Sequence, residues 1–208
     1  MKFGVLGTGV VGQTIASKLL GLGHDLRLGS RAASETAVTF NDAAEFGHVV
    51  FNCLPGAVAM SVLETLPDVV GDKVLVDVSN PLDFSQGFPP SLSVVNTDSL
   101  AEMIQRALPR AKVVKALNTV NADIMVNPAL LPAPTDLFIA GNDEQAKVVV
   151  RALLVTFGWA EANIRDLGGI SAARAAEMYL PLWLNLMGAT GTAAFNIHVV
   201  TQDAPPTG

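Results

Sequence analysis

The amino-acid sequence predicts an α/β fold: a doubly wound parallel sheet with helices on both faces, followed by a small helical extension at the C-terminus. Short β-branched runs alternate along the chain with helix-like segments. Each strand-like run is nearly continuous in apolar residues, as strands covered on both faces should be. With 208 residues, 50% of them hydrophobic, the chain is long enough to bury one substantial core.

Six segments are expected to form the sheet. They combine valine, isoleucine, leucine and phenylalanine with few charges, and turn residues bound them. Most are followed by a helix-like segment, which is typical of connections between parallel strands. The predicted strands are residues 2–7, 25–30, 48–54, 72–79, 111–117 and 135–141.

Helix-like segments follow four of these strands. The first should end at Gly21 and Gly23, because glycine favours the backbone turn that terminates helices. The last two are preceded by polar side chains that can accept the first free amides of a helix. The candidate caps are Thr97 or Asp98 and Asn142 or Asp143. The predicted helices are residues 10–23, 56–66, 98–108 and 143–157.

The connection formed by residues 31–47 departs from this pattern. Parallel strands are usually joined by a dozen or more residues that include a helix, and this stretch also contains the strand-like residues 37–40. If residues 37–40 form a third strand, the helix before it is reduced to a loop. The alternative is an irregular edge of the sheet, and the sequence leaves both open.

A glycine-rich motif follows the first strand directly. Gly7, Gly9 and Gly12 have the G-x-G-x-x-G spacing of dinucleotide-binding folds. Gly7 permits a tight turn, Gly9 leaves room for a diphosphate to approach the backbone, and Gly12 lets the helix pack closely on the strand. The free amides at the start of the helix then face an anion. The motif thus predicts a Rossmann nucleotide-binding site.

The end of the second strand indicates which dinucleotide is bound. An acidic residue at this place holds the ribose 2′-hydroxyl of NAD, but here the chain has Ser30 and Arg31. A hydroxyl and a guanidinium would bind a 2′-phosphate, which a carboxylate would repel. We therefore expect NADP(H) as the cofactor.

Three polar loops follow strands at what should be the carboxyl edge of the sheet, where doubly wound folds bind ligands. Ordinary turn chemistry could also explain these residues, but their position at one edge favours a role in binding. The candidates are Leu54 and Pro55, Asn80 and Pro81, and Asn118 and Thr119.

Composition excludes several other classes of function. The net charge of −6 and pI near 4.9 argue against nucleic acid or an anionic membrane as partner. The single Cys53 and the lack of a targeting pattern at the start of the chain favour a cytoplasmic protein. No histidine has the spacing of a metal ligand, so we expect no metal site.

The sequence reveals no catalytic acid or base. Asp77 and Asp166 lie in strand-like runs without an evident partner. Hydride exchange between two flat redox rings depends mainly on positioning, whereas an alcohol dehydrogenase must also move a proton. The catalytic residues therefore remain unassigned, and hydride exchange between rings is the better match.

The last third of the chain contains an apolar, helix-like segment. Between residues 170 and 187, Met178, Leu182 and Leu186 fall near one helical face and Trp183 near a neighbouring one. This pattern indicates a core or subunit contact, or contact with a ligand. Pro181 should begin a turn or kink the helix.

Along nearly its whole length the chain resembles the coenzyme F420-dependent NADP oxidoreductase family. The motifs that carry the resemblance are GTGVVGQ, LGSR, VDVSNPLDF, AKVVKALNTVNA, IAGND and ARAAEMYLPLWLNLMG, in this order. The resemblance implies a Rossmann domain that binds NADP(H), a small C-terminal part that closes over the cleft, and a homodimer. It implies cofactor binding by Gly7, Thr8, Gly9, Val10, Val11, Ser30 and Arg31. It also implies a ring-binding region for the deazaflavin F420 that includes Pro55, Asn80, Pro81, Asn118, Thr119 and Leu182.

These expectations define a domain plan and a function. Residues 1–168 would form the NADP-binding domain, 169–200 a helical cap or dimerisation segment, and 201–208 a flexible tail. The expected activity is hydride transfer between NADP(H) and a small-molecule acceptor, either F420 or a flavin-like compound. The alternatives are a noncatalytic NADPH-binding sensor or interaction domain, and a reductase of ferric chelates or of a small carbonyl or imine.

Overall fold

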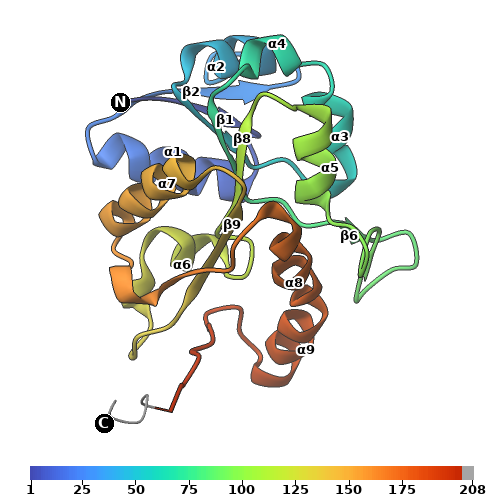
Figure 1. Cartoon of the computed structure of the whole chain (residues 1–208), viewed down its shortest axis with the longest axis vertical. Helices are drawn as coiled ribbons and strands as arrows, with labels where there is room; N and C mark the ends of the chain where they lie inside the picture. Colours follow the sequence, from blue (N-terminus) through green and yellow to red (C-terminus); the bar gives the residue numbers. More distant parts are fainter. Residues whose placement is uncertain (203–208) are drawn as a thin grey trace, which may run out of the picture.

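The computed structural model describes residues 1–202. Within this part of the chain, eight strands form a sheet in the order β10-β9-β8-β5-β4-β1-β2-β3, and β6 and β7 form a separate ribbon. Figure 1 shows the sheet between two groups of helices, so the predicted α/β class is confirmed. The strands of the sheet are β1 (Lys2–Leu6), β2 (Asp25–Ser30), β3 (Val38–Thr39), β4 (Val49–Asn52), β5 (Val74–Asp77), β8 (Lys112–Lys115), β9 (Leu137–Gly141) and β10 (Ile164–Asp166). The ribbon consists of β6 (Leu82–Asp83) and β7 (Ser91–Leu92).

The six strands from β3 to β8 in the sheet run parallel, as predicted. The prediction was wrong for β9, which runs antiparallel to β8 and pairs with it only at Val114↔Gly141 and Lys115↔Ala140. The reason is the short connection, in which a helix of five residues does not carry the chain back across the sheet. β9 therefore starts beyond the carboxyl edge of the parallel strands and returns toward it.

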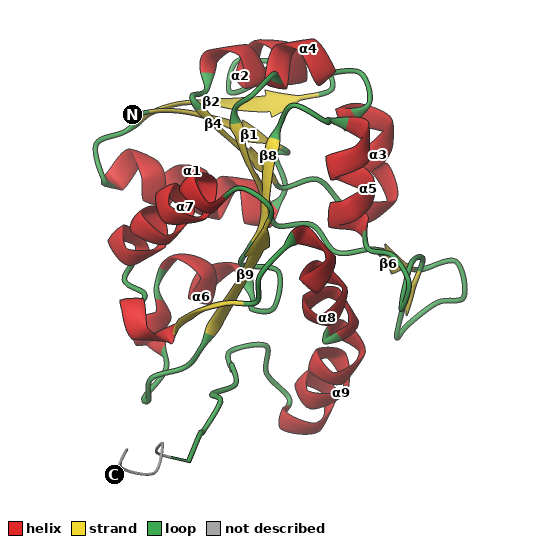
Figure 2. Cartoon of the chain, in the orientation of Figure 1, coloured by secondary structure: helices red, strands yellow, loops and turns green. Residues whose placement is uncertain are grey.

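Helices cover both faces of the sheet (Figure 2), and each face has its own apolar core. On one face the core includes Ile15 of α1 and Leu154 of α7, and on the other Leu63 of α3 and Ile104 of α5. The helices are α1 (Val10–Gly21), α2 (Phe40–Phe46), α3 (Gly56–Leu63), α4 (Pro67–Val70), α5 (Leu100–Ala107), α6 (Ala122–Val126), α7 (Glu144–Phe157), α8 (Ala173–Met178) and α9 (Leu180–Thr190). Short 3-10 turns are η1 (Pro128–Leu130), η2 (Glu161–Asn163) and η3 (Ile170–Ala172).

The structure resolves the alternatives for residues 31–47. Val38 and Thr39 form the short edge strand β3, and residues 31–37 contain no helix. A loop is long enough for this connection, because β3 pairs with only the last two residues of β2. From the end of β2 the chain has to run back along the sheet by only about 7 Å before β3 begins. The sequence-based assignment missed α2, which begins directly after β3. Thr39 caps this helix by accepting the amide of Asp42 at 3.2 Å.

Three predicted helix boundaries can be compared with the structure, one C-terminal stop and two N-terminal caps, and two of them are confirmed. Gly23 adopts a positive φ of 77° just after α1, and Asp143 caps α7 by accepting the amide of Ala146 at 2.8 Å. For α5 the predicted caps were wrong, because Ser99 takes this position and accepts the amide of Glu102. Asp98 instead binds Arg106 at the surface.

The C-terminal extension consists of η3, α8 and α9, after which the chain runs back past the start of β9. Pro181 stands in the first turn of α9, two residues after Tyr179, which separates α8 from α9. The path stays nearly continuous, since Tyr179 between the two helices keeps helical dihedral angles. The predicted tail of residues 201–208 lies outside the described residues from 203 onward. Among residues 1–202 the longest helix has 14 residues, too few to cross a bilayer.

Candidate functional site

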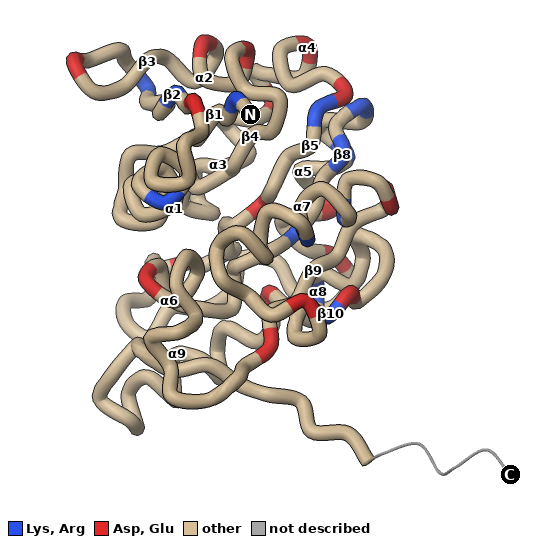
Figure 3. The backbone as a smooth tube through the Cα atoms, turned by 90° about the vertical axis from the view of Figure 1, so that its left-hand side faces the viewer, with Lys and Arg blue, Asp and Glu red and all other residues tan. Residues whose placement is uncertain are grey.

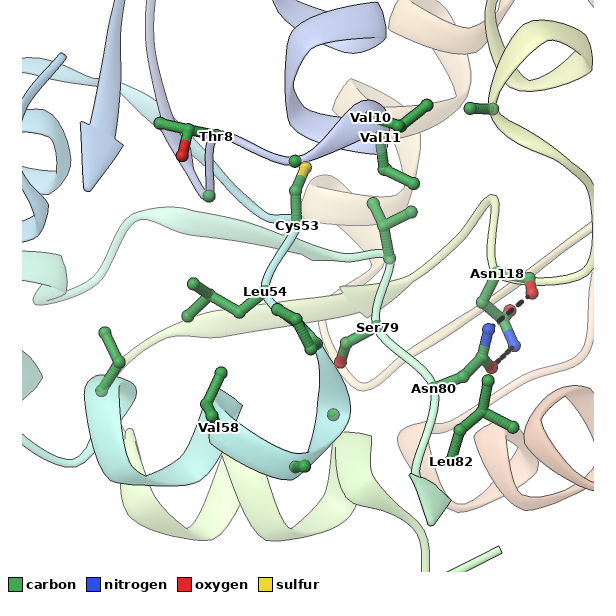
Figure 4. Close-up of a pocket in the computed structure, with 18 of the residues that line it drawn as sticks. Thr8, Val10, Val11, Cys53, Leu54, Val58, Ser79, Asn80, Leu82 and Asn118 are labelled. Carbon is green, nitrogen blue, oxygen red and sulfur yellow. Dashed lines mark hydrogen bonds between the residues drawn. The ribbon is translucent and has the colours of Figure 1, made fainter. Parts of the chain in front are cut away.

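A cavity of about 890 Å³ lies at the carboxyl ends of the parallel strands. The loops after β1, β2, β4, β5 and β8 reach it, and residues of α9 line one side. Ligands of doubly wound folds bind at this edge. Figure 4 shows several of the side chains around it. The lining residues are Gly7–Val11, Ser30, Arg31, Ala32, Phe40, Cys53, Leu54, Pro55, Gly56, Ala57, Val58, Val62, Val78, Ser79, Asn80, Leu82, Phe84, Asn118, Val120, Asn121, Ala122, Met125, Leu180 and Trp183.

Residues 7–9, here called the glycine loop, form the turn from β1 into α1. Gly7 has a φ of +117°, which L side chains rarely adopt, and a Cβ there would lie 2.8 Å from the carbonyl oxygen of Cys53. A Cβ at Gly12 would lie 2.0 Å from the carbonyl oxygen of Gly7, so only glycine lets α1 pack this closely. Gly9 differs, because its Cβ would meet no atom within 4 Å. The side of Gly9 is therefore open toward the cavity that it lines.

The end of β2 forms a second part of the wall. The Ser30 hydroxyl donates a hydrogen bond to the carbonyl oxygen of Ala32. Arg31 is exposed, and no ion pair within residues 1–202 involves it. Its guanidinium thus retains its hydrogen-bond donors for a ligand. Phe40, the first residue of α2, lines the same cavity.

Two asparagines connect the loops after β5 and β8. Asn118 Nδ2 donates to Asn80 Oδ1 at 2.9 Å and to the carbonyl oxygen of Ala176 at 3.1 Å, while Asn80 Nδ2 donates to the carbonyl oxygen of Asn118 at 2.9 Å. Figure 4 shows the two side chains facing each other. Leu117, just before Asn118, adopts a positive φ of 64°, which turns the chain at this point. The pair thereby fixes the end of the cavity that is farther from the glycine loop.

The chain is similar to several known proteins. The family model described as "NADP oxidoreductase coenzyme F420-dependent" matches residues 2–81. The F420-dependent NADP reductase of Methanocaldococcus jannaschii is 32% identical over 146 residues, covering 70% of this chain and 64% of the relative. The crystal structure of a candidate F420-dependent NADP-reductase from Arthrobacter sp. FB24 superposes with a TM-score of 0.91 and 42% identity, covering 97% of this chain and 100% of that one.

The chain belongs to the F420-dependent NADP oxidoreductase family. Another relative is metalloreductase STEAP3 of Rattus norvegicus, 30% identical over 198 residues. The match covers 88% of this chain but 38% of STEAP3, so the chain spans less than two thirds of either curated relative. More distant solved structures, such as an imine reductase of Streptomyces aurantiacus at 18% identity and a TM-score of 0.63, share the fold.

In this family member most of the residues singled out from the sequence lie around one cavity. The sequence placed them on five separate segments, and the sheet brings them to one edge. Those that line the cavity are Gly7, Thr8, Gly9, Val10, Val11, Ser30, Arg31, Leu54, Pro55, Asn80 and Asn118.

Four of the singled-out residues are not in the lining. Gly12 is buried under the glycine loop, and Pro81 lies buried next to Gly56 at the start of α3. Thr119 is buried, and its hydroxyl oxygen has no hydrogen-bond partner within residues 1–202. Leu182 is 55% exposed, and Leu180 and Trp183 of the same helix line the cavity instead.

Sequence reasoning missed several lining residues. Phe40 was hidden because α2 was not predicted, and Val58 and Val62 of α3 are ordinary apolar residues. Leu82 lies in β6 and Phe84 directly after it, and this segment carries no strong strand pattern. Their only signal was position, since each follows a predicted strand end or loop at this edge.

Beneath the cavity lies a buried ionic network. Lys115 Nζ lies 2.8 Å from Asp77 Oδ2 and 2.8 Å from Glu177 Oε1, and all three side chains are at most 1% exposed. No partner for Asp77 was evident from the sequence, and Lys115 of the neighbouring strand is that partner. Burial alone would lower the pKa of Lys115, but the charges of Asp77 and Glu177 outweigh it and raise this pKa. The lysine therefore stays charged.

The lining of the cavity is almost free of charge. Of its lining residues Arg31 alone carries a charged side chain. Burial, with the nearby charge of Asp77, raises the pKa of the Cys53 thiol well above its usual range, so the thiol stays protonated. No cluster of metal-ligating side chains occurs among the described residues. The cavity can orient flat ligands, and no Asp, Glu, His or Lys side chain lines it.

Proposed function

We propose that this protein is an NADP(H)-dependent oxidoreductase that transfers hydride between the nicotinamide and a deazaflavin (F420) or flavin-like acceptor. The observation that carries the proposal is a single cavity that extends from the glycine loop to the Asn80–Asn118 pair and contains only one charged side chain, Arg31. The names of the relatives support NADP as cofactor and F420 as acceptor.

The residues at one end of the cavity fit NADP(H). The open side of Gly9 leaves space for a diphosphate. The first amides of α1 have no side-chain cap and no acidic neighbour in the first turn, so they are available to an anion. Ser30 and Arg31, at the end of the neighbouring strand β2, would hold the 2′-phosphate. The bound cofactor would supply or accept the hydride at its nicotinamide.

The chain itself would contribute orientation and exclusion of water. Val10, Leu54 and Val58 present apolar surface to the cavity, while the Asn80–Asn118 pair holds a fixed polar edge. Positioning two carbons about 3–3.5 Å apart requires no proton relay. Reduction of a carbonyl or imine needs a proton at the reacting group itself, and no Asp, Glu, His, Lys or Tyr lines the cavity. A ring acceptor also takes up one proton, but at a ring atom other than the one that receives the hydride, so solvent can supply it. A ring acceptor is therefore favoured.

We propose residues 1–168 as the NADP-binding domain and residues 169–200 as the part that completes the acceptor site and forms a homodimer. α9 contains no Lys, Arg, Asp or Glu, so its backbone is drawn tan along its whole length in Figure 3. Only Leu180 of this apolar helix is buried, whereas Leu182 is 55% and Met178 of α8 37% exposed. Such a helix is typical of a subunit interface. A cytoplasmic location remains a prediction.

The test is NADPH oxidation followed at its absorbance band with a panel of acceptors. Saturable turnover with F420 or a flavin supports the proposal. Turnover with ferric chelates alone would favour the second candidate, a metal reductase, which the similarity to STEAP3 suggests. Tight NADPH binding with no turnover across F420, flavins, ferric chelates and small imines would indicate a noncatalytic sensor and contradict the proposed activity.

A further inference from the structure

Glu177 of helix α8 forms hydrogen bonds with the N-terminus of helix α5. This buried carboxylate accepts the amides of Leu100 at 2.8 Å and Ala101 at 3.1 Å. These are the first two amides of α5, which no residue of the helix itself can satisfy. Ser99 accepts the third. A residue distant in sequence therefore completes the cap of α5, while it also pairs with Lys115.

A second pair of side chains joins the same two helices. Arg174 Nε donates to Glu102 Oε2 at 2.8 Å, and Arg174 Nη2 donates to Glu102 Oε1 at 2.6 Å. This two-point geometry fixes the direction of the guanidinium as well as its distance. Two residues beyond Arg174, the carbonyl oxygen of Ala176 accepts the side-chain amide of Asn118 from the cavity edge. Contacts at three residues of α8 thus determine where the helix lies.

Helix α8 continues into α9, which forms part of the wall of the cavity. Tyr179 keeps helical angles, and the amide of Trp183 donates to its carbonyl oxygen at 3.0 Å, so α8 and α9 form one nearly continuous rod. Leu180 and Trp183, which lie three and six residues beyond Glu177, line the cavity. In α9 itself only Leu180 is buried, and Trp183 stacks on Phe195 with the ring centroids 5.3 Å apart. The backbone of this wall is therefore held mainly through α8, where Arg174 and Glu177 supply the side-chain contacts to α5.

We infer that Arg174 and Glu177 are positioning residues for the hydride acceptor, because they hold the wall formed by Leu180 and Trp183 at a fixed distance from the loops that would bind the nucleotide. The inference rests on the proposed function. Neither residue lines the cavity, so neither would touch a ligand. Loosening their contacts should weaken productive binding of the acceptor and leave the binding of NADPH unchanged.

The test compares R174Q and E177Q with R106Q. Arg106 belongs to α5, the helix that Arg174 and Glu177 contact, but it pairs with Asp98 at the surface and not with α8. R106Q therefore controls for the loss of an ion pair of α5 that does not hold α8. The measurements are the NADPH Kd by calorimetry, and kcat and KM for the acceptor that the wild type turns over. We expect R174Q and E177Q to lose at least about fivefold in kcat/KM for the acceptor with an NADPH Kd within about twofold of wild type. R106Q should match the wild type in both.

A fluorescence readout makes the test independent of turnover. The chain has two tryptophans, and Trp159 is 2% exposed, so a change in acrylamide quenching reports mainly on Trp183. Quenching should rise in R174Q and E177Q and not in R106Q. Equal losses of NADPH and acceptor binding, or folded variants with wild-type kinetics and quenching, would overturn the inference.

The outcomes separate this inference from the proposed function. If the wild type oxidises no NADPH with any acceptor, the proposed activity fails, and the quenching comparison still decides whether the two residues hold the wall. If E177Q does not fold, R174Q decides alone, because the Arg174 side chain is 35% exposed and its loss leaves the buried network intact.

Discussion

Substitution of Gly9 by alanine should separate ligand binding from folding. Gly9 has φ −73° and ψ −178°, which alanine adopts without strain. A Cβ at this position would meet no atom of the protein within 4 Å. The variant should therefore fold as well as the wild type, or be more stable by about 0.4–1 kcal/mol, because alanine restricts the unfolded chain.

The same methyl group would enter the space that we assign to the diphosphate of NADP(H). Displacing the diphosphate from the first amides of α1 should remove about one hydrogen bond to a charged group, which contributes roughly 1.5–3 kcal/mol. The NADPH Kd should rise by about 10- to 150-fold.

Calorimetric titration with NADPH and thermal unfolding measure the two effects. Gly12→Ala is the matched control, because its Cβ would lie 2.0 Å from the carbonyl oxygen of Gly7 and should lower the melting temperature itself. A Gly9→Ala protein that binds NADPH as tightly as the wild type, or that melts far below it, would refute the assignment of this loop.

Three further predictions concern single side chains. Arg31→Ala should weaken NADPH binding by about 1.5–3 kcal/mol and hardly change NADH binding; equal losses in parallel titrations would contradict its role. Asp143→Ala should lower the free energy of unfolding in urea by about 1 kcal/mol, because the amide of Ala146 loses its cap, whereas an unchanged midpoint would contradict this. The hydrogen bonds from Arg174 hold the pKa of Glu102 below its usual range. This pair thus stabilises the fold above about pH 4.3 and loses its effect as the pH falls through the lowered pKa. Glu102→Gln should lower the melting temperature at pH 7, with a difference that shrinks below about pH 4; a difference independent of pH would exclude ionisation as its cause.

Local patterns were sufficient to predict the architecture. The apolar runs located the strands, and the glycine spacing located the turn into α1, because both depend on neighbouring residues. The direction of β9 could not be predicted, since an apolar strand has the same pattern in a parallel or an antiparallel pair. Helix α2 was missed because seven residues are too few for a clear helical period.

Contacts between distant segments account for what the sequence did not reveal about the site. Glu177 lies 77 residues from Leu100, whose amide it accepts, and no spacing rule connects them. The burial of Lys115 and Asp77 likewise follows from strands that neighbour each other only in the sheet. Leu182 was selected from the family resemblance, but the face of α9 that lines the cavity depends on how α8 is held.

The reversed direction of β9 affects the side of the cavity that the C-terminal extension forms. Since β9 meets β8 at only two residue pairs, it extends the sheet by about 10 Å past the carboxyl edge and supports α8 there. The ribbon of β6 and β7 projects from the body (Figure 1), and Phe84 and Phe88, in the loop between its two strands, are 59% and 71% exposed. Phe84 also lines the cavity. The cavity is therefore bordered on one side by helices that the extended sheet supports, and on another by the side chain of an exposed loop.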